Sequence, residues 1–124
     1  MKKTKFGEFI RQKRLKLKLT LRQFCRKKGY DTAYISRLEN GLLPPPKDSE
    51  KLEALAIALE IKKNTQDWVH FFDLAATEKG EFPKDIQENF SELKGTLPAF
   101  YRTLRKKKIT EKDIKELLKL LQQK

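Results

Sequence analysis

Residues 20–41, TLRQFCRKKGYDTAYISRLENG, predict two short helices joined by a tight turn. Thr20 is a favourable N-cap for the first helix, and Gln23, three residues later, completes the pattern of a capping box. Gly29 readily adopts the left-handed backbone conformation that ends a helix. Asp31 follows almost at once and is suited to cap the second helix.

Apolar side chains on these two helices are spaced so that they can face each other. Phe24 and Cys25 lie on one side of the first helix. Ile35 and Leu38, three positions apart, lie on one side of the second. The other faces are polar and basic, so the pattern predicts a small shared apolar seam beneath a polar and basic surface.

Residues of this segment match a known family in their order and spacing. The matching positions are a threonine cap, a small residue in the first helix, a glycine in the turn and a closing run, namely Thr20, Cys25, Gly29, Ile35, Ser36, Leu38, Glu39, Asn40 and Gly41. The segment resembles the helix-turn-helix domain of the phage repressor and Cro proteins, also called the Xre family. The resemblance continues from Pro44 to Ile61 and covers roughly half of the chain.

The resemblance implies that the helix capped by Asp31 enters the major groove of double-stranded DNA. The positions that would face the bases are Thr32, Ala33, Ser36 and Arg37. The guanidinium of Arg37 can donate to guanine, and the methyl groups of Thr32 and Ala33 can contact thymine. A contact from Arg37 to the DNA backbone is the alternative.

Contacts to DNA phosphates are expected around this helix. Arg22 and Gln23 lie near the N-terminus of the preceding helix, where backbone N–H groups and the helix dipole favour an anion. The full set of expected phosphate contacts is Thr20, Arg22, Gln23, Arg11, Tyr34, Asn40 and Lys47. The resemblance also implies a structural ion pair between Arg14 and Glu39, because phage repressors often pair an arginine with a glutamate at these positions.

Charge is distributed unevenly along the chain. The formal net charge is +12. Residues 1–47 hold fourteen Lys or Arg against three acidic residues, whereas residues 48–124 hold fifteen against fourteen. A surface that only needs to be solvated would not segregate charge in this way, whereas a surface that neutralises phosphates would. The distribution indicates a nucleic-acid partner.

Other function classes find little support in the sequence. A single cysteine excludes an internal disulfide framework, and no apolar run approaches the roughly 18 residues of a membrane span. The sequence has no glycine-rich nucleotide loop, no cysteine or serine near a credible base, and a single histidine. We therefore predict no catalytic residue, no metal site, no cofactor and no membrane contact, and we expect a cytoplasmic protein.

A basic arm and a helix precede the central segment. The arm is a solubilising tail or a phosphate contact, and its cations are Lys2, Lys3 and Lys5. The helix spans about 6–17, and the apolar residues that recur at helical spacing are Phe6, Phe9, Ile10 and Leu17.

A proline-rich loop and two helices follow the central segment. The loop, residues 40–46, is a stiff spacer or a polyproline ligand. Ser49 is expected to cap a fourth helix, and Thr65 to cap a fifth that ends near Gly80. Apolar residues cover most of the circumference of the fifth helix. We therefore expect it to be sandwiched between other elements, with His70 packed beside aromatic rings rather than bound to a metal.

Three shorter helical segments are predicted beyond Gly80. Pro83 and Pro98 are suited to open the first two, and Thr110 to cap the last. The lysine run 106–108 is a solvated loop or a contact to nucleic acid. The last segment carries an apolar stripe made of Ile114, Leu117, Leu118 and Leu121.

The predicted fold is all-α, a five-helix repressor-like helix-turn-helix domain with additional C-terminal helices. We expect a DNA-binding domain over 1–63 and a dimerisation or partner-binding region over 64–124. A homodimer would hold two recognition helices about 34–36 Å apart in successive major grooves. The alternative is that the C-terminal helices only cover one another in a monomer. The expected interface residues are Trp68, Phe71, Phe72, Ile114, Leu117, Leu118 and Leu121.

The expected function is that of a sequence-specific transcriptional regulator, a dimeric repressor that recognises a palindromic operator. Antitoxins of the HigA type also resemble this family, and they neutralise a partner toxin through segments outside the helix-turn-helix domain. Toxin binding with autoregulation of the operon is therefore the first alternative. An interaction module that has lost DNA binding is the second, and the segregation of charge argues against it.

Overall fold

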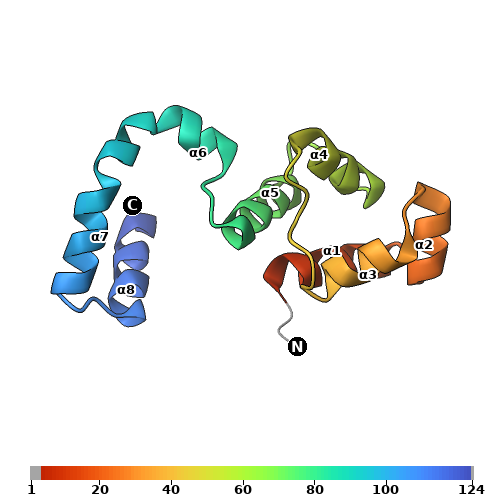
Figure 1. The fold of residues 1–124 in the computed structure, drawn as a ribbon, viewed down its shortest axis with the longest axis horizontal. Coiled ribbons are helices and arrows are strands. Elements are labelled where there is room, and N and C mark those ends of the chain that lie inside the picture. Colours follow the sequence, from red (N-terminus) through yellow and green to blue (C-terminus); the bar gives the residue numbers. More distant parts are fainter. Residues whose placement is uncertain (1–3, 124) are drawn as a thin grey trace. The chain divides into compact units, whose positions relative to one another are not determined.

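The computed structural model describes residues 4–123, apart from the side chains of Leu93 and Lys94, and this part of the chain holds helices and turns but no strand (Figure 1). The elements in order are α1 (Lys5–Lys16), α2 (Leu21–Lys28), α3 (Thr32–Glu39), α4 (Ser49–Ala58), α5 (Gln66–Lys79), α6 (Lys84–Asn89), the 3-10 helix η1 (Ser91–Gly95), α7 (Leu97–Lys106) and α8 (Glu111–Gln122). The predicted all-α fold is confirmed. Lys2 and Lys3 of the predicted basic arm lie outside the described residues. Across residues 4–123, no helix is both long enough and apolar enough to cross a membrane.

The chain divides into two compact units, residues 1–84 and residues 85–124. In the first unit α1 lies against both α3 and α5, and α2 lies against α3 (Figure 1). Side chains from all five helices fill one core, whose largest fully buried members include Phe6, Ile10, Phe24, Ile35, Leu38, Leu55 and Phe71. The five-helix domain with additional C-terminal helices is therefore present as predicted.

The fifth helix, α5, belongs to the first unit, whereas the predicted boundary between residues 63 and 64 placed it in the second. Phe71 of α5 is fully buried, and its ring centre lies 5.3 Å from that of Phe6 on α1. Helix α5 therefore supplies part of the core that α1 needs, and the boundary lies after it.

The prediction that α5 is sandwiched needs correction. One face of α5 is covered, with Phe71, Ala75 and Ala76 buried. The opposite face is open, because Val69 is 53% exposed and His70 is also exposed. His70 nevertheless contacts an aromatic ring, at 5.2 Å between its ring centre and that of Phe9.

Helix caps agree with the sequence pattern in α5 but are shifted by one residue in α4. The Thr65 hydroxyl accepts a hydrogen bond from the backbone N–H of Trp68 at 3.2 Å, and Gly80 ends the helix with φ at 74°. In α4 the cap is Asp48 and not Ser49. The Asp48 carboxylate accepts a hydrogen bond from the N–H of Glu50 at 2.8 Å.

Helix α1 approaches the end of α3 unusually closely at Gly7. A Cβ atom at this position would lie 2.5 Å from the carbonyl oxygen of Glu39 and 2.7 Å from that of Leu38. Both are backbone atoms that cannot swing away. Because glycine has no Cβ, Gly7 allows α1 to lie this close to the end of α3. No role for Gly7 was predicted from the sequence.

The second unit contains most of α6 together with η1, α7 and α8. Pro98 lies in the first turn of α7, as predicted. Thr110 caps α8 in a complete capping box with Asp113. No residue whose side chain is described between positions 85 and 123 is buried.

Candidate nucleic-acid interface

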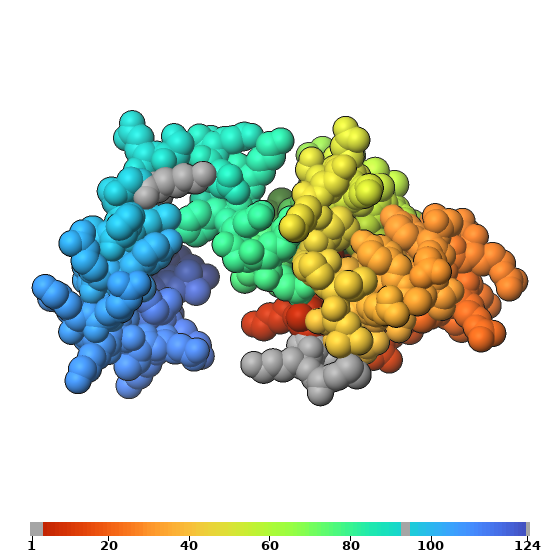
Figure 2. Space-filling view, viewed as in Figure 1, coloured from red at the N-terminus to blue at the C-terminus, as the bar shows by residue number. Residues whose placement is uncertain are grey.

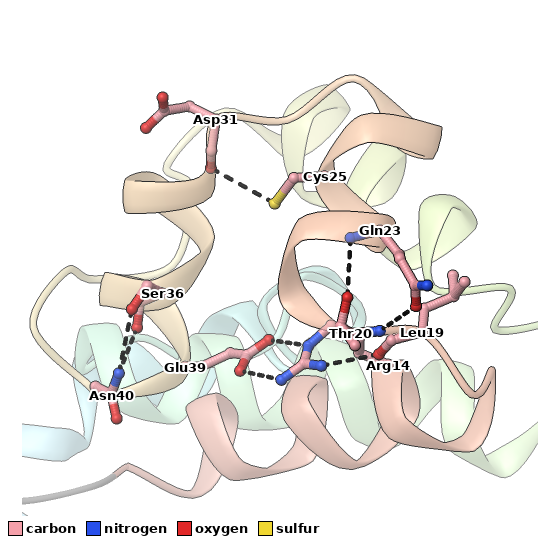
Figure 3. A network of polar contacts seen from close by, with 9 residues as sticks. All are labelled: Arg14, Leu19, Thr20, Gln23, Cys25, Asp31, Ser36, Glu39 and Asn40. Atoms are coloured by element: carbon pink, nitrogen blue, oxygen red, sulfur yellow. Dashed lines mark hydrogen bonds and ion pairs between the residues drawn. The ribbon is translucent and has the colours of Figure 1, made fainter.

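The two central helices, α2 and α3, are held by the caps that their sequence predicts (Figure 3). The Thr20 hydroxyl accepts a hydrogen bond from the N–H of Gln23 at 3.2 Å, and the Gln23 side-chain oxygen accepts one from the N–H of Thr20 at 2.9 Å. Gly29 ends α2 with φ at 78°. The Asp31 carboxylate then accepts from the N–H of Tyr34 at 3.0 Å and starts α3. The start and end of each helix are therefore fixed by local hydrogen bonds.

A shared apolar seam fixes the orientation of α3 on the rest of the domain. Phe24 and Cys25 of α2 are 0% and 3% exposed, and Ile35 and Leu38 of α3 are 2% and 1% exposed. The ring of Tyr30, in the turn, stacks on Phe24 with the ring centres 6.0 Å apart. Because the seam occupies one side of α3, the opposite side must face solvent.

The exposed side of α3 carries the residues predicted to contact DNA bases. Thr32, Ala33 and Arg37 are exposed, and Ser36 is half-buried. Within the described part of the chain, no acidic side chain forms an ion pair with Arg37. The arrangement offers one guanidinium and small side chains to a ligand that lies along α3. The surfaces of α2 and α3, orange to gold, lie side by side in Figure 2.

Tyr34 flanks this row and is half-buried. Burial raises the pKa of its hydroxyl above the ordinary value, so this group stays protonated at neutral pH and can donate a hydrogen bond.

The residues predicted to contact phosphate fall into two groups. Arg22 and Lys47 are exposed and form no ion pair with a described acidic side chain. Thr20 and Gln23 are exposed, but the hydroxyl and the amide oxygen already serve as acceptors in the capping box. Donors remain on both side chains, and donors are what a phosphate requires.

Arg11 lies on α1. It lines a hollow between α1 and α5 together with Glu8, His70 and Leu74. Arg11 is exposed there, and its contact with a phosphate stays a prediction.

Asn40 closes α3 rather than standing free beside it. Its side-chain amide donates to the carbonyl oxygen of Ser36 at 2.8 Å and lies 3.5 Å from the Ser36 hydroxyl. The amide is therefore a second donor to the Ser36 carbonyl, which also accepts from the backbone N–H of Asn40 at 3.1 Å (Figure 3).

A buried ion pair links α1 to the end of α3 (Figure 3). Arg14 Nε donates to one carboxylate oxygen of Glu39 at 2.7 Å, and Arg14 Nη2 donates to the other at 2.9 Å. A third hydrogen bond runs from Arg14 to the carbonyl oxygen of Leu19 at 2.9 Å. The hydrogen bonds to Glu39 raise the pKa of Arg14 above its ordinary value. The contact with Leu19 was not predicted, because a backbone acceptor leaves no signal in the sequence.

Cys25 is a packed side chain without a reactive setting. It is 3% exposed, and its sulfur lies 3.8 Å from the carbonyl oxygen of Asp31 (Figure 3). Burial raises the pKa of the thiol above its ordinary value, which disfavours the nucleophilic thiolate. The residue therefore serves the seam between α2 and α3.

A hollow that the sequence did not predict lies next to the start of α3. Its volume is about 410 Å³, and its lining residues include Tyr30, Tyr34, Lys51 and Leu55. Tyr30 is thus both a packing partner of Phe24 and a wall of this hollow. Aromatic residues in a turn give no distinct pattern, so no signal pointed to Tyr30 beforehand.

The residues predicted to form a dimer interface lie in two different settings. Phe71 is fully buried within the first unit, and Trp68 and Phe72 are half-buried against the same core. Phe71 therefore has no surface to offer a second chain, which corrects its place in that set. The residues on α8 are all exposed, and they are Ile114, Leu117, Leu118 and Leu121.

In a comparison with known protein families, residues 10–64 match the Helix-turn-helix family. No curated protein and no solved structure gives a significant match. The matched segment contains α2 and α3 with their caps and the seam between them. Residues 10–64 therefore belong to the helix-turn-helix family of the phage repressor and Cro type, and they form the DNA-binding part of a transcriptional regulator.

Proposed function

We propose that the protein recognises specific sequences in double-stranded DNA through α3 and acts as a dimeric repressor on a palindromic operator. The observation that carries this proposal is the two-sided character of α3. Ile35 and Leu38 anchor one side in the core, while Thr32, Ala33 and Arg37 are exposed on a helix whose position is fixed. A rigid helix with exposed donors and methyl groups suits contacts to base edges in the major groove.

The basic surface supports binding to the DNA backbone. The excess charge lies in residues 1–47, which include α1, α2 and α3. Each phosphate that a protein neutralises contributes about −0.9 to the slope of log K against log salt concentration. About six contacts per dimer would give a slope near −5. An affinity that does not change between low and physiological salt would contradict DNA binding.

Two arginines provide a matched test of base recognition. Arg37 lies on the exposed side of α3, and Arg22 lies in the first turn of α2. Arg37→Ala is expected to cost about 1–3 kcal/mol on the specific site and to relax preference at one base pair. Arg22→Ala is expected to weaken all sequences to a similar extent, because a phosphate contact carries no base information.

The measurement is a titration of each variant with operator DNA and with unrelated duplex of the same length. The dissociation constant for unrelated DNA divided by that for operator DNA measures specificity. This ratio should fall for Arg37→Ala and stay unchanged for Arg22→Ala. If Arg37→Ala lowers both affinities equally, Arg37 is a backbone contact and the proposed mode of base recognition is wrong.

A further inference from the structure

The end of α7 carries a concentration of positive charge that follows an acidic stretch of the chain. Residues 48–101 hold six Lys or Arg against eleven acidic residues. Residues 102–108, RTLRKKK, then hold five cations and no acidic residue. All five side chains are exposed, and they are Arg102, Arg105, Lys106, Lys107 and Lys108. The average charge of residues 48–124 conceals this local excess.

Three of these cations share one side of α7. Successive residues of an α-helix are turned by about 100°. On this spacing Arg102, Arg105 and Lys106 fall within an arc of about 100°. Two half-buried side chains of the helix, Leu97 and Leu104, lie on the other side. The three cations therefore form one exposed surface, which we call the basic face of α7.

No acidic side chain in the described part of the chain balances the basic face. Helix α7 contains no acidic residue, and the whole stretch 93–110 contains none. The ion pairs among the described residues do not involve any cation of this face. Cations three or four positions apart on a helix repel each other and destabilise it. A bound anion would relieve this repulsion.

Stabilisation of the helix end accounts for only part of the charge. Cations in the last turn of a helix interact favourably with the helix dipole, and Arg105 and Lys106 lie in that turn. Arg102 lies before the last turn, and Lys108 lies beyond the C-cap residue Lys107. Because the effect of the dipole falls off within one turn, the positive charge extends further than the helix itself requires.

Helix α8 carries a row of three lysines with a different setting. Lys112, Lys115 and Lys119 also fall on one side of their helix. Glu116 follows Lys112 by four positions and therefore lies next to this row, where its carboxylate offsets part of the charge. The row on α8 has as many cations as the basic face of α7 and belongs to the same unit, so it provides a matched control.

We propose that the basic face of α7 contacts the phosphate backbone of the DNA to which α3 binds. The inference rests on the proposed function and extends the contact with DNA beyond residues 10–64. Contacts to phosphates carry no base information, so the basic face adds affinity without changing the preferred sequence.

The connection between the helices favours DNA over other anionic partners. An anionic membrane surface also attracts clustered lysine and arginine side chains. In this chain, however, only residues 80–83 separate α5 of the helix-turn-helix unit from α6. Short connections between two binding modules raise the effective concentration of the second module to about the millimolar range. A contact of three charges, weak by itself, is therefore strengthened once α3 is bound.

The first test is the salt dependence of duplex binding by the full chain. The α7 triple variant combines Arg102→Gln, Arg105→Gln and Lys106→Gln, and glutamine keeps a high helix propensity. Each lost phosphate contact removes about 0.9 from the slope of log K against log salt concentration, so the slope should become shallower by about 2.7 per bound chain. Between about 50 and 200 mM salt, the wild-type affinity should fall about 40-fold further per bound chain than that of the variant.

The control is an α8 triple variant that removes the same charge from the same unit. It combines Lys112→Gln, Lys115→Gln and Lys119→Gln, and its slope should stay close to that of the wild type. Equal slopes in the wild type and the α7 triple variant would overturn the proposal. An equal change in both triple variants would also overturn it, because the effect would then be a general attraction by net charge.

Footprinting with hydroxyl radicals locates the contact along the DNA. The wild-type chain should protect backbone positions outside the half-sites, and the α7 triple variant should leave these positions open to cleavage. Protection within the half-sites should be the same for both chains. Identical footprints would overturn the proposal, because the basic face would then contact no phosphate of its own.

Vesicles that contain phosphatidylserine test the other partner. If the α7 triple variant loses binding to these vesicles but keeps the wild-type slope on DNA, the basic face belongs to a membrane contact and the proposal is overturned.

Failure of this inference is distinguishable from failure of the proposed function. A wild-type chain that selects a DNA sequence, with a slope that the α7 triple variant leaves unchanged, would overturn the contact of α7 alone. A wild-type chain that binds no DNA would overturn the proposed function as well.

Discussion

Removal of Glu39 is expected to destabilise the DNA-binding unit strongly. The side chains of Arg14 and Glu39 are 8% and 7% exposed. Glu39→Ala removes the two hydrogen bonds to the guanidinium and leaves it with only the Leu19 carbonyl as a partner. Hydrogen bonds to charged groups contribute about 1.5–3 kcal/mol each, and removing one member of a buried ion pair costs about 3–5 kcal/mol. We expect a loss of about 3–5 kcal/mol in the free energy of unfolding.

Unfolding of this unit can be followed in the full chain through the fluorescence of Trp68, the only tryptophan in the sequence. A change of 1 kcal/mol shifts the melting temperature by about 4–8 °C in a domain of 60–100 residues. Glu39→Ala should therefore lower the melting temperature by at least about 12 °C. Urea titration at fixed temperature provides the free energy directly.

A second ion pair serves as the matched control. Glu53 lies 3.1 Å from Lys63, and both side chains are well exposed, at 44% and 62%. Glu53→Ala should cost less than about 1 kcal/mol, because solvent screens the pair. If Glu39→Ala shifts the melting temperature no more than Glu53→Ala does, the buried ion pair does not stabilise the domain and the reasoning is refuted.

Two backbone positions lead to further predictions of opposite sign. Gly7→Ala should destabilise by about 1–3 kcal/mol in urea titrations, because its Cβ would collide with two carbonyl groups, and this overpacking outweighs the higher helix propensity of alanine. Gly95→Ala is the control and should be neutral, since no atom lies within 4 Å of a Cβ built there; an equal loss in both variants would contradict the close approach. Lys18→Gly should stabilise by up to about 1 kcal/mol in the same assay, because Lys18 holds φ at 60° without being glycine. Lys16→Gly is the control, because it removes the same charge from a helical residue, and it should destabilise by about 1 kcal/mol. A loss of stability in Lys18→Gly would show that the backbone at Lys18 is not strained.

Local signals in the sequence were sufficient to predict the central helices. Thr20, Gln23, Gly29 and Asp31 act through hydrogen bonds and backbone angles within a few residues of themselves, so their roles follow from spacing alone. The N-cap of α4 was predicted at Ser49, one residue after the true cap Asp48, because the two residues are adjacent and both types are good N-caps. The local sequence pattern does not show which of two adjacent N-cap residues begins the helix.

Contacts between distant segments were harder to predict. The apolar pattern of α5 indicates burial but not the partner, so Phe71 was expected at a dimer interface and lies instead against Phe6. The close approach at Gly7 was missed because a helical glycine gives the same signal whether space or another helix lies beside it. The hollow beside α5 that Arg11 lines was not predicted, because it depends on how α1 is rotated.

Selection of bound sites from a library of random duplex DNA tests the central claim most directly, namely that α3 recognises bases as part of a dimer. The account predicts enrichment of a two-fold symmetric sequence whose half-site centres lie about 10 base pairs apart, one helical turn, or a multiple of this spacing. Repetition with Arg37→Ala should relax one position in each half-site and leave the spacing unchanged. Absence of any enriched sequence, or an enriched sequence without two-fold symmetry, would contradict the account.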